Sequence, residues 1–171
     1  MAGGDRHQTL TAPCYRVDMR ANEPLQLNHS WPLVEQCEQF ALGTLHDADP
    51  IAFAALDRVT PEAAGIGAWQ CRLADASLRW TNPIYDLFGL PRGSRIARAA
   101  AVAHYAEESR AAMERLRDHA IRHHRGFTLD AAIATTGGER RWMRLIAAPR
   151  VGDGIVTELF GLKQDVTHLY R

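Results

Sequence analysis

The sequence has 171 residues, of which 46% are apolar and 23% charged, as expected for one globular domain with some extra length. Its formal net charge is +0, so no global field favours nucleic acid or acidic lipid. Three dispersed cysteines, Cys14, Cys37 and Cys71, argue against a disulfide framework and a zinc site. No apolar run approaches the roughly 18 residues of a membrane helix, and the N-terminus lacks the apolar centre of a signal peptide. We therefore expect a cytoplasmic protein.

The N-terminal part is expected to be a flexible tail followed by a helical extension. Residues 1–29 are polar and have no steady period, whereas residues 30–62 contain helix signals. Ser30 is a plausible cap, and short helices are also expected to begin near Asp49 and Thr60, each of which precedes a proline. One apolar stripe at helical spacing follows Ser30 and includes Leu33, Val34, Cys37 and Phe40.

The remaining chain, residues 63–171, has the texture of an α+β domain. The stretches "AWQCRLAD" and "SLRWTN" predict two short strands, and "PIYDLFGLP" predicts a short helix that a glycine ends. A long helix is expected from about residue 106 to 124, closed by Gly126. Three strands follow, separated by glycine-containing turns. This order predicts a five-stranded antiparallel sheet with helices on one face.

Four stretches give the sequence a family resemblance. They are "GIGAWQCRLADASLRWTN", "YDLFGLP", "GGERRWMR" and "LKQDVT". In this order and spacing they resemble the PAS domain, in particular the subfamily often found in bacterial histidine kinases and cyclic-di-GMP enzymes. The resemblance covers residues 63–171. The chain departs from the family pattern at "AHYAEES", where His104 is kept but the following Pro-Asp is replaced.

The resemblance implies an inner face that either holds a ligand or is simply a filled core, and the filled core is favoured. The same apolar side chains would serve both: Trp69, Trp80, Ile84, Tyr85, Phe88, Phe127, Met143, Leu145 and Leu159. Flavin adduct chemistry of the light-oxygen-voltage type is not expected, because no cysteine follows Cys71. Flavin bound without an adduct stays open. Haem would need an axial ligand, for which His124 is nearest the apolar stripe of the long helix. The alternative is a surface histidine favoured by the helix dipole.

The outer face of the sheet is the expected signalling or dimer surface. Its candidate residues are Trp142, Arg144, Phe160, Leu162 and Asp165, together with Leu33, Cys37 and Phe40 from the extension. We expect a charge-assisted hydrogen bond between Arg144 and Asp165. The alternative is an exposed ion pair that contributes less than about 1 kcal/mol.

These features predict a single-domain PAS regulator that acts by protein contacts and homodimerisation. Its partner would be a histidine kinase or another PAS protein, with no nucleic acid or membrane partner. The alternatives are a small-molecule, haem or flavin sensor, or the sensory fragment of a histidine kinase. The chain ends at Arg171, so we expect no output domain to follow. We expect no enzymatic activity, because the sequence shows neither a nucleophile-base-acid set nor a glycine-rich phosphate loop.

Overall fold

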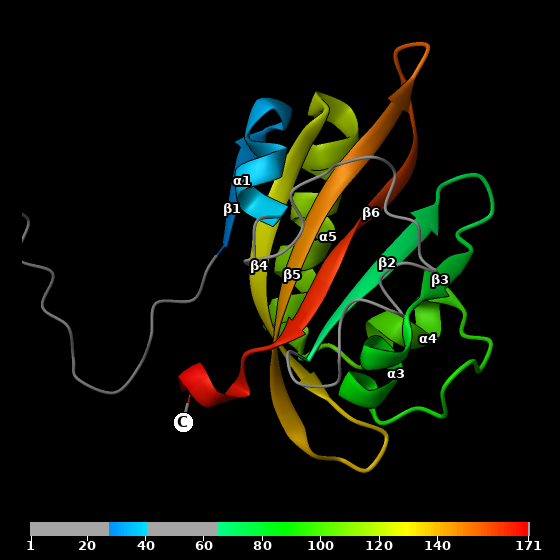
Figure 1. Cartoon of the computed structure of the whole chain (residues 1–171), viewed down its shortest axis with the longest axis vertical. Helices are drawn as coiled ribbons and strands as arrows, with labels where there is room; N and C mark the ends of the chain where they lie inside the picture. Colours follow the sequence, from blue (N-terminus) through cyan, green and yellow to red (C-terminus); the bar gives the residue numbers. More distant parts are fainter. Residues whose placement is uncertain (1–27, 41–64, 171) are drawn as a thin grey trace, which may run out of the picture.

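The chain folds around a six-stranded antiparallel sheet with the strand order β1-β4-β5-β6-β2-β3 (Figure 1). The structure is a computed structural model that describes residues 28–40 and 65–170. The strands are β1 (Asn28–Pro32), β2 (Ile66–Arg72), β3 (Leu78–Trp80), β4 (Arg125–Ala134), β5 (Arg140–Gly152) and β6 (Ile155–Asp165). The helices are η1 (Leu33–Glu35), α1 (Gln36–Phe40), α3 (Asn82–Phe88), α4 (Arg98–Ala103), α5 (Glu107–His123) and η3 (Thr167–Tyr170). The predicted α+β architecture is confirmed. The sheet has the five predicted strands and one further strand, β1.

Helices α3, α4 and α5 cover the inner face of the sheet and enclose the main core. Side chains alternate between the two faces of a strand, so one strand supplies every second residue to this core. On β4 the inward residues are Phe127, Leu129, Ala131 and Ile133, and all four are buried there as predicted. On β5, Met143, Leu145 and Ala147 do the same.

The connections between these elements follow the predicted turn chemistry, with one correction. Ala76 takes a positive φ of 54° in the β2–β3 turn, and Gly89 ends α3 in the left-handed region at φ 69°. The long helix, however, is closed by His124, which adopts φ 52°. The prediction that Gly126 closes this helix is wrong, because Gly126 already lies inside β4.

The outer face carries a second apolar cluster, which the N-terminal segment covers. Its buried members are Trp31, Phe40, Ile66, Ala68, Ile146, Ala148 and Leu162, with Leu33 and Phe160 packed against them. The expected packing of the extension on this face is therefore seen for the described residues. The start of the extension differs from prediction. Ser30 lies in a strand paired with β4 and does not cap a helix.

Trp31 explains why this segment is a strand. A Cβ added to Gly126 would lie 2.0 Å from the Trp31 ring. The indole therefore fits against β4 only because Gly126 has no side chain. Trp31 is 1% exposed, and its Nε1 donates a hydrogen bond to Thr128 Oγ1 at 3.1 Å. Pairing of β1 with β4 places Trp31 directly opposite Gly126. Local helix signals are thus overridden by a tertiary contact.

Parts of the N-terminal predictions fall beyond the described residues. Residues 1–27 of the tail predicted for 1–29 lie outside them, as do the helices expected near Asp49 and Thr60. Residues 28 and 29 of the predicted tail belong to β1. Within the described ranges, no helix has the length and apolar character needed to cross a membrane.

Candidate functional site

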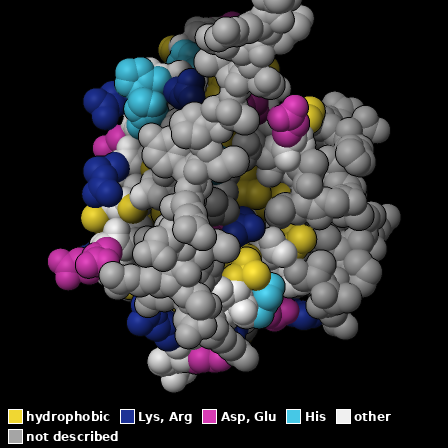
Figure 2. Space-filling model, turned by 90° about the vertical axis from the view of Figure 1, so that its left-hand side faces the viewer, with side chains coloured by type: hydrophobic (Ala, Val, Ile, Leu, Met, Phe, Trp, Pro, Cys, Tyr) yellow, Lys and Arg dark blue, Asp and Glu magenta, His cyan; other side chains and the backbone are white. Residues whose placement is uncertain are grey.

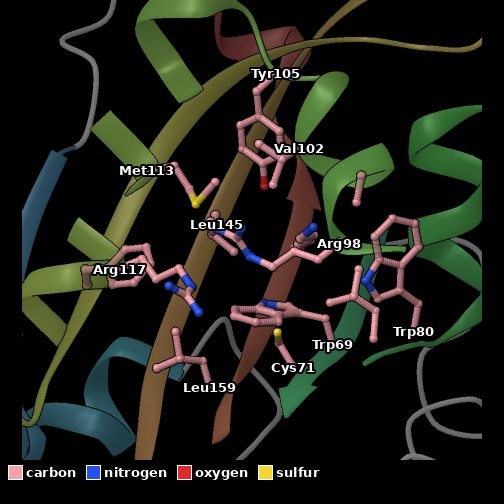
Figure 3. Close-up of a pocket in the computed structure, with 14 residues that line it drawn as sticks. Trp69, Cys71, Trp80, Arg98, Val102, Tyr105, Met113, Arg117, Leu145 and Leu159 are labelled. Carbon is pink, nitrogen blue, oxygen red and sulfur yellow. The ribbon is translucent and has the colours of Figure 1, made fainter. Parts of the chain in front are cut away.

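A cavity of about 50 Å³ lies between the inner face of the sheet and helices α4 and α5 (Figure 3). Five predicted pocket residues line it: Trp69, Trp80, Phe127, Leu145 and Leu159. Four others are buried in the adjoining core and do not line the cavity: Ile84, Tyr85, Phe88 and Met143. The lining also includes residues that the sequence did not single out: Cys71, Leu78, Arg98, Ala101, Val102, Tyr105, Met113, Arg117 and Lys163.

Lys163 is the most unusual residue of the cavity. It is the only lysine of the chain, and it is 6% exposed. Its partner across the β5–β6 ladder is Leu145, which also faces the core. The sequence contains a signal for this burial. Positions 159, 161 and 163 of the strand share one face, and that face points to the core, so the side chain of Lys163 is expected to point inward.

Aromatic rings surround the Lys163 ammonium. Nζ lies 4.8 Å from the ring centroids of Trp80 and Phe88, and 5.8 and 5.9 Å from those of Trp69 and Tyr105. Ring faces attract a cation, and each contact contributes about 0.5–2 kcal/mol. Among the described residues, however, no hydrogen-bond acceptor or carboxylate pairs with Nζ.

Burial makes the charged form of Lys163 unfavourable. Desolvation lowers the pKa of its ammonium from 10.5 to about 7, and the nearby Cys71 acts in the opposite direction. Lys163 therefore changes charge near neutral pH, and small changes in the cavity will shift its protonation.

Two arginines add positive charge to the same cavity. Arg98 on α4 pairs with Glu114 on α5 through hydrogen bonds of 2.5 and 2.7 Å. Arg117 makes only a 3.8 Å contact with the exposed Asp118, and no hydrogen bond of its guanidinium falls within the described residues. Figure 3 shows Arg98 and Arg117 extending toward a common central space.

The remaining polar groups of the cavity are also donors. The indole nitrogen of Trp80 is buried, and no described residue accepts a hydrogen bond from it. A buried donor left unpaired costs about 1–3 kcal/mol of stability. Burial raises the pKa of the Tyr105 hydroxyl, so Tyr105 keeps its proton. Burial also raises the pKa of Cys71, while Arg117, Arg98 and Lys163 lower it. The cavity is apolar with a positive, donor-rich polar side.

The cavity residues fit neither haem nor flavin. No histidine is among the lining residues, and His124 lies exposed at the C-terminal end of α5. Of the two alternatives for His124, the structure shows the exposed histidine at the helix end. A flavin ring system needs a pocket of several hundred Å³, far more than the 50 Å³ present.

On the outer face, Arg144 binds a partner other than the predicted one. Its Nε and Nη2 donate to the two carboxylate oxygens of Asp130 at 2.8 and 2.9 Å, and Tyr170 Oη donates to Asp130 at 2.6 Å. The predicted bond to Asp165 is wrong because Asp165 stands opposite Met143, which puts it on the other face of the sheet. Asp165 instead accepts a hydrogen bond from the Thr167 backbone N–H at 2.9 Å.

The other outer-face candidates divide into covered and accessible residues. Leu162 and Phe40 are buried within the chain, and Leu33 and Phe160 pack against their cluster. Trp142 stacks on Tyr170, with ring centroids 4.1 Å apart. Cys37 is exposed. On the described surface visible in Figure 2, basic, acidic and histidine side chains are interspersed, in keeping with the net charge of +0.

Comparison with known proteins identifies the fold. No family profile matches the sequence, and no curated protein does so either. Solved structures do match. The N-terminal domain of a diguanylate cyclase with a PAS/PAC sensor from Marinobacter aquaeolei matches with a TM-score of 0.57 and 17% identity, covering 62% of this chain and 99% of that one. A PAS domain from Colwellia psychrerythraea matches with a TM-score of 0.54 and 14% identity, covering 67% and 93%.

A third match belongs to a longer protein. An RNA-binding light-oxygen-voltage receptor has a TM-score of 0.54 and 15% identity, covering 62% of this chain and only 30% of that one. This chain thus spans less than a third of the receptor's length. Together with the strand order and the inner cavity, the matches show that the chain has the PAS fold. The PAS interpretation of the sequence is confirmed at the level of fold.

Proposed function

We propose that the chain is a sensory PAS domain that binds a small molecule in the inner cavity and signals through protein contacts. The observation that carries this proposal is Lys163, which is buried beside Arg98 and Arg117 and has no carboxylate partner within the described part of the chain. Uncompensated buried charge lowers the stability of the fold. Perturbed ionisable groups in a cavity are typical of functional sites.

The two faces of the sheet are mechanically connected. On β5 and β6, Leu145 and Lys163 point to the cavity, whereas their neighbours Arg144 and Leu162 point to the outer face. Successive side chains of a strand lie on opposite faces, so a strand shift caused by a ligand moves both sets. The outer face holds α1 and η3, which such a shift would disturb.

The output is proposed to be a protein contact of the outer face in the cytoplasm, with a homodimer as the signalling unit. A histidine kinase or another PAS protein would be the downstream partner. Phe160 supports this location, because it remains half-buried on the outer face beside Phe40, with ring centroids 5.9 Å apart. Half-buried aromatic side chains are common anchors of protein interfaces.

A second candidate is an interaction module with no ligand. It is favoured by the small cavity volume of about 50 Å³, which leaves the core nearly filled. In that case the protein would signal by its outer face alone, and Lys163 would be held only by the surrounding rings.

Native mass spectrometry of the full chain from ammonium bicarbonate tests the proposal. We expect a dimer that carries a small bound molecule. Phe160→Glu should release the monomer while the bound mass stays, whereas Arg115→Glu on the exposed face of α5 should change neither. A monomer without any bound mass would contradict both parts of the proposal. A ligand-free dimer would support the second candidate.

A further inference from the structure

The polar groups of the inner cavity share one chemical property. Lys163, Arg117 and the indole nitrogen of Trp80 are donors, and no acceptor pairs with them among the described residues. An ammonium offers three N–H donors, a guanidinium five and an indole one. The ring contacts of Lys163 compensate its charge in part but accept no hydrogen bond of ordinary strength. Oxygen atoms in this space would give these donors the acceptors that the described residues do not supply.

We propose that the cavity binds a small carboxylate whose oxygen atoms accept hydrogen bonds from Lys163, Arg117 and Trp80. This inference rests on the proposed sensory function and assigns its ligand class. A carboxylate supplies two oxygens with about four acceptor positions and one negative charge. Charge-assisted hydrogen bonds of this kind are stronger than neutral ones. A cation is disfavoured because three positive side chains line the cavity.

The remaining lining defines the rest of the ligand. Met113, Phe127, Leu145 and Leu159 give the cavity apolar walls, which favour an alkyl group over a purely inorganic anion. The volume of about 50 Å³ is a few times the 10–15 Å³ that one water needs. The ligand is therefore a short-chain carboxylate of acetate or propionate size.

The positive side chains of the site also act on a neighbouring thiol. Cys71 lies on β2, and its thiol pKa is lowered by Arg117, Arg98 and Lys163 together, although burial raises it more. Three cations from β6, α4 and α5 thus act on one point of the cavity wall. Among the described residues, Arg98 pairs closely with Glu114 at 2.5 Å, whereas Arg117 has only the 3.8 Å contact with the exposed Asp118. Binding of an anion would restore charge balance.

The test is a titration of the full chain with acetate and propionate, each matched by its neutral isostere, acetamide or propionamide. The readout is the indole N–H resonance of Trp80, one of four tryptophans, in a chloride-free buffer at neutral pH. The affinity limit per heavy atom places the tightest dissociation constant for acetate at about 40 μM, so the titration extends to about 20 mM. We expect saturable binding of both carboxylates and affinities about tenfold or more lower for the amides.

Variants locate the site. Lys163→Met and Arg117→Met should each weaken propionate binding about tenfold or more, and should weaken any propionamide binding less, because the amide lacks the charge. Arg115→Met is the matched control, because Arg115 is exposed on the same helix, and should bind propionate like the parent. Arg117→Met keeps the test decisive if Lys163→Met does not fold.

Three results would overturn the inference. Amides that bind as tightly as carboxylates would leave the sensory function in place but remove the anion assignment. Nitrate that binds as tightly as propionate would show that the cavity does not select for an alkyl group. No saturable response to any probe would exclude a small carboxylate, and a native mass spectrum without bound mass would then remove the sensory function as well.

Discussion

Replacement of Lys163 by methionine should stabilise the protein, although the change is in the core. Lys163 is 6% exposed, and burial lowers the pKa of its ammonium from 10.5 to about 7. Methionine keeps the length of the side chain and removes the charge. Each pKa unit corresponds to about 1.4 kcal/mol, so the lysine costs about 4 kcal/mol of unfolding free energy at pH 7. The ring contacts reduce this cost, and we expect Lys163→Met to gain about 2–4 kcal/mol.

The stability advantage of Lys163→Met over the parent should decrease as the pH rises. Unfolded chains protonate Lys163 below about pH 10.5, whereas the folded chain does so only below about pH 7. Between these values the unfolded state holds the extra proton, so the unfolding free energy of the parent rises with pH. The advantage of Lys163→Met is therefore largest at and below pH 7. It falls to about half by pH 9 and vanishes above 10.5.

Urea denaturation of the parent and Lys163→Met at pH 7, 8 and 9 measures this effect. The difference between the two proteins at each pH cancels the titration of groups that both contain. Arg115→Met should run parallel to the parent, because Arg115 is exposed and far less constrained. A Lys163→Met protein that is less stable at pH 7, or a difference that stays constant with pH, would contradict a destabilising buried ammonium at position 163.

Other predictions concern the outer face and are also measured by urea denaturation or size-exclusion chromatography. Gly126→Ala should lower the unfolding free energy by about 2–4 kcal/mol, because its Cβ would lie 2.0 Å from the Trp31 ring. The same substitution should have little effect in a Trp31→Ala protein, which lacks the ring. Equal losses in both proteins would contradict this contact. Asp130→Asn should lower the unfolding free energy by about 3 kcal/mol, because it breaks the ion pair of the buried Asp130 with Arg144. Asp165→Asn should lower it by less than about 1 kcal/mol. The reverse order would favour the Arg144–Asp165 pair predicted from the sequence. A chain truncated to begin at Thr60 should lose solubility or its oligomeric state, since β1 and α1 no longer cover the outer cluster; an unchanged elution profile would contradict this.

Patterns local in sequence predicted most of the fold. Alternation on β4 and β5 placed Phe127 and Leu145 in the core, and the short helix before Gly89 has its expected end. These features depend on neighbours within a few residues. The strand β1 was not predictable in this way, because it depends on Trp31 meeting Gly126, 95 positions further along the chain.

The candidate site was predicted only in its apolar part. Aromatic and aliphatic residues of the strands identified one wall of the cavity, including Trp69 on β2 and Leu159 on β6. The charged part comes from α4, α5 and β6, and their relative rotation is set by packing that the sequence does not show. No sequence motif singled out Arg98 or Arg117. Lys163 could have been identified, because its strand position predicts an inward side chain.

The most direct test of this account is the titration of Lys163 itself by NMR. Incorporation of ¹³C-labelled lysine gives a single side-chain Cε signal, since the chain has one lysine. The account predicts a titration midpoint near pH 7 in the free protein and a higher midpoint when propionate is added, because a bound carboxylate stabilises the ammonium. A midpoint near 10.5 that propionate does not move would place Lys163 in water and contradict the account.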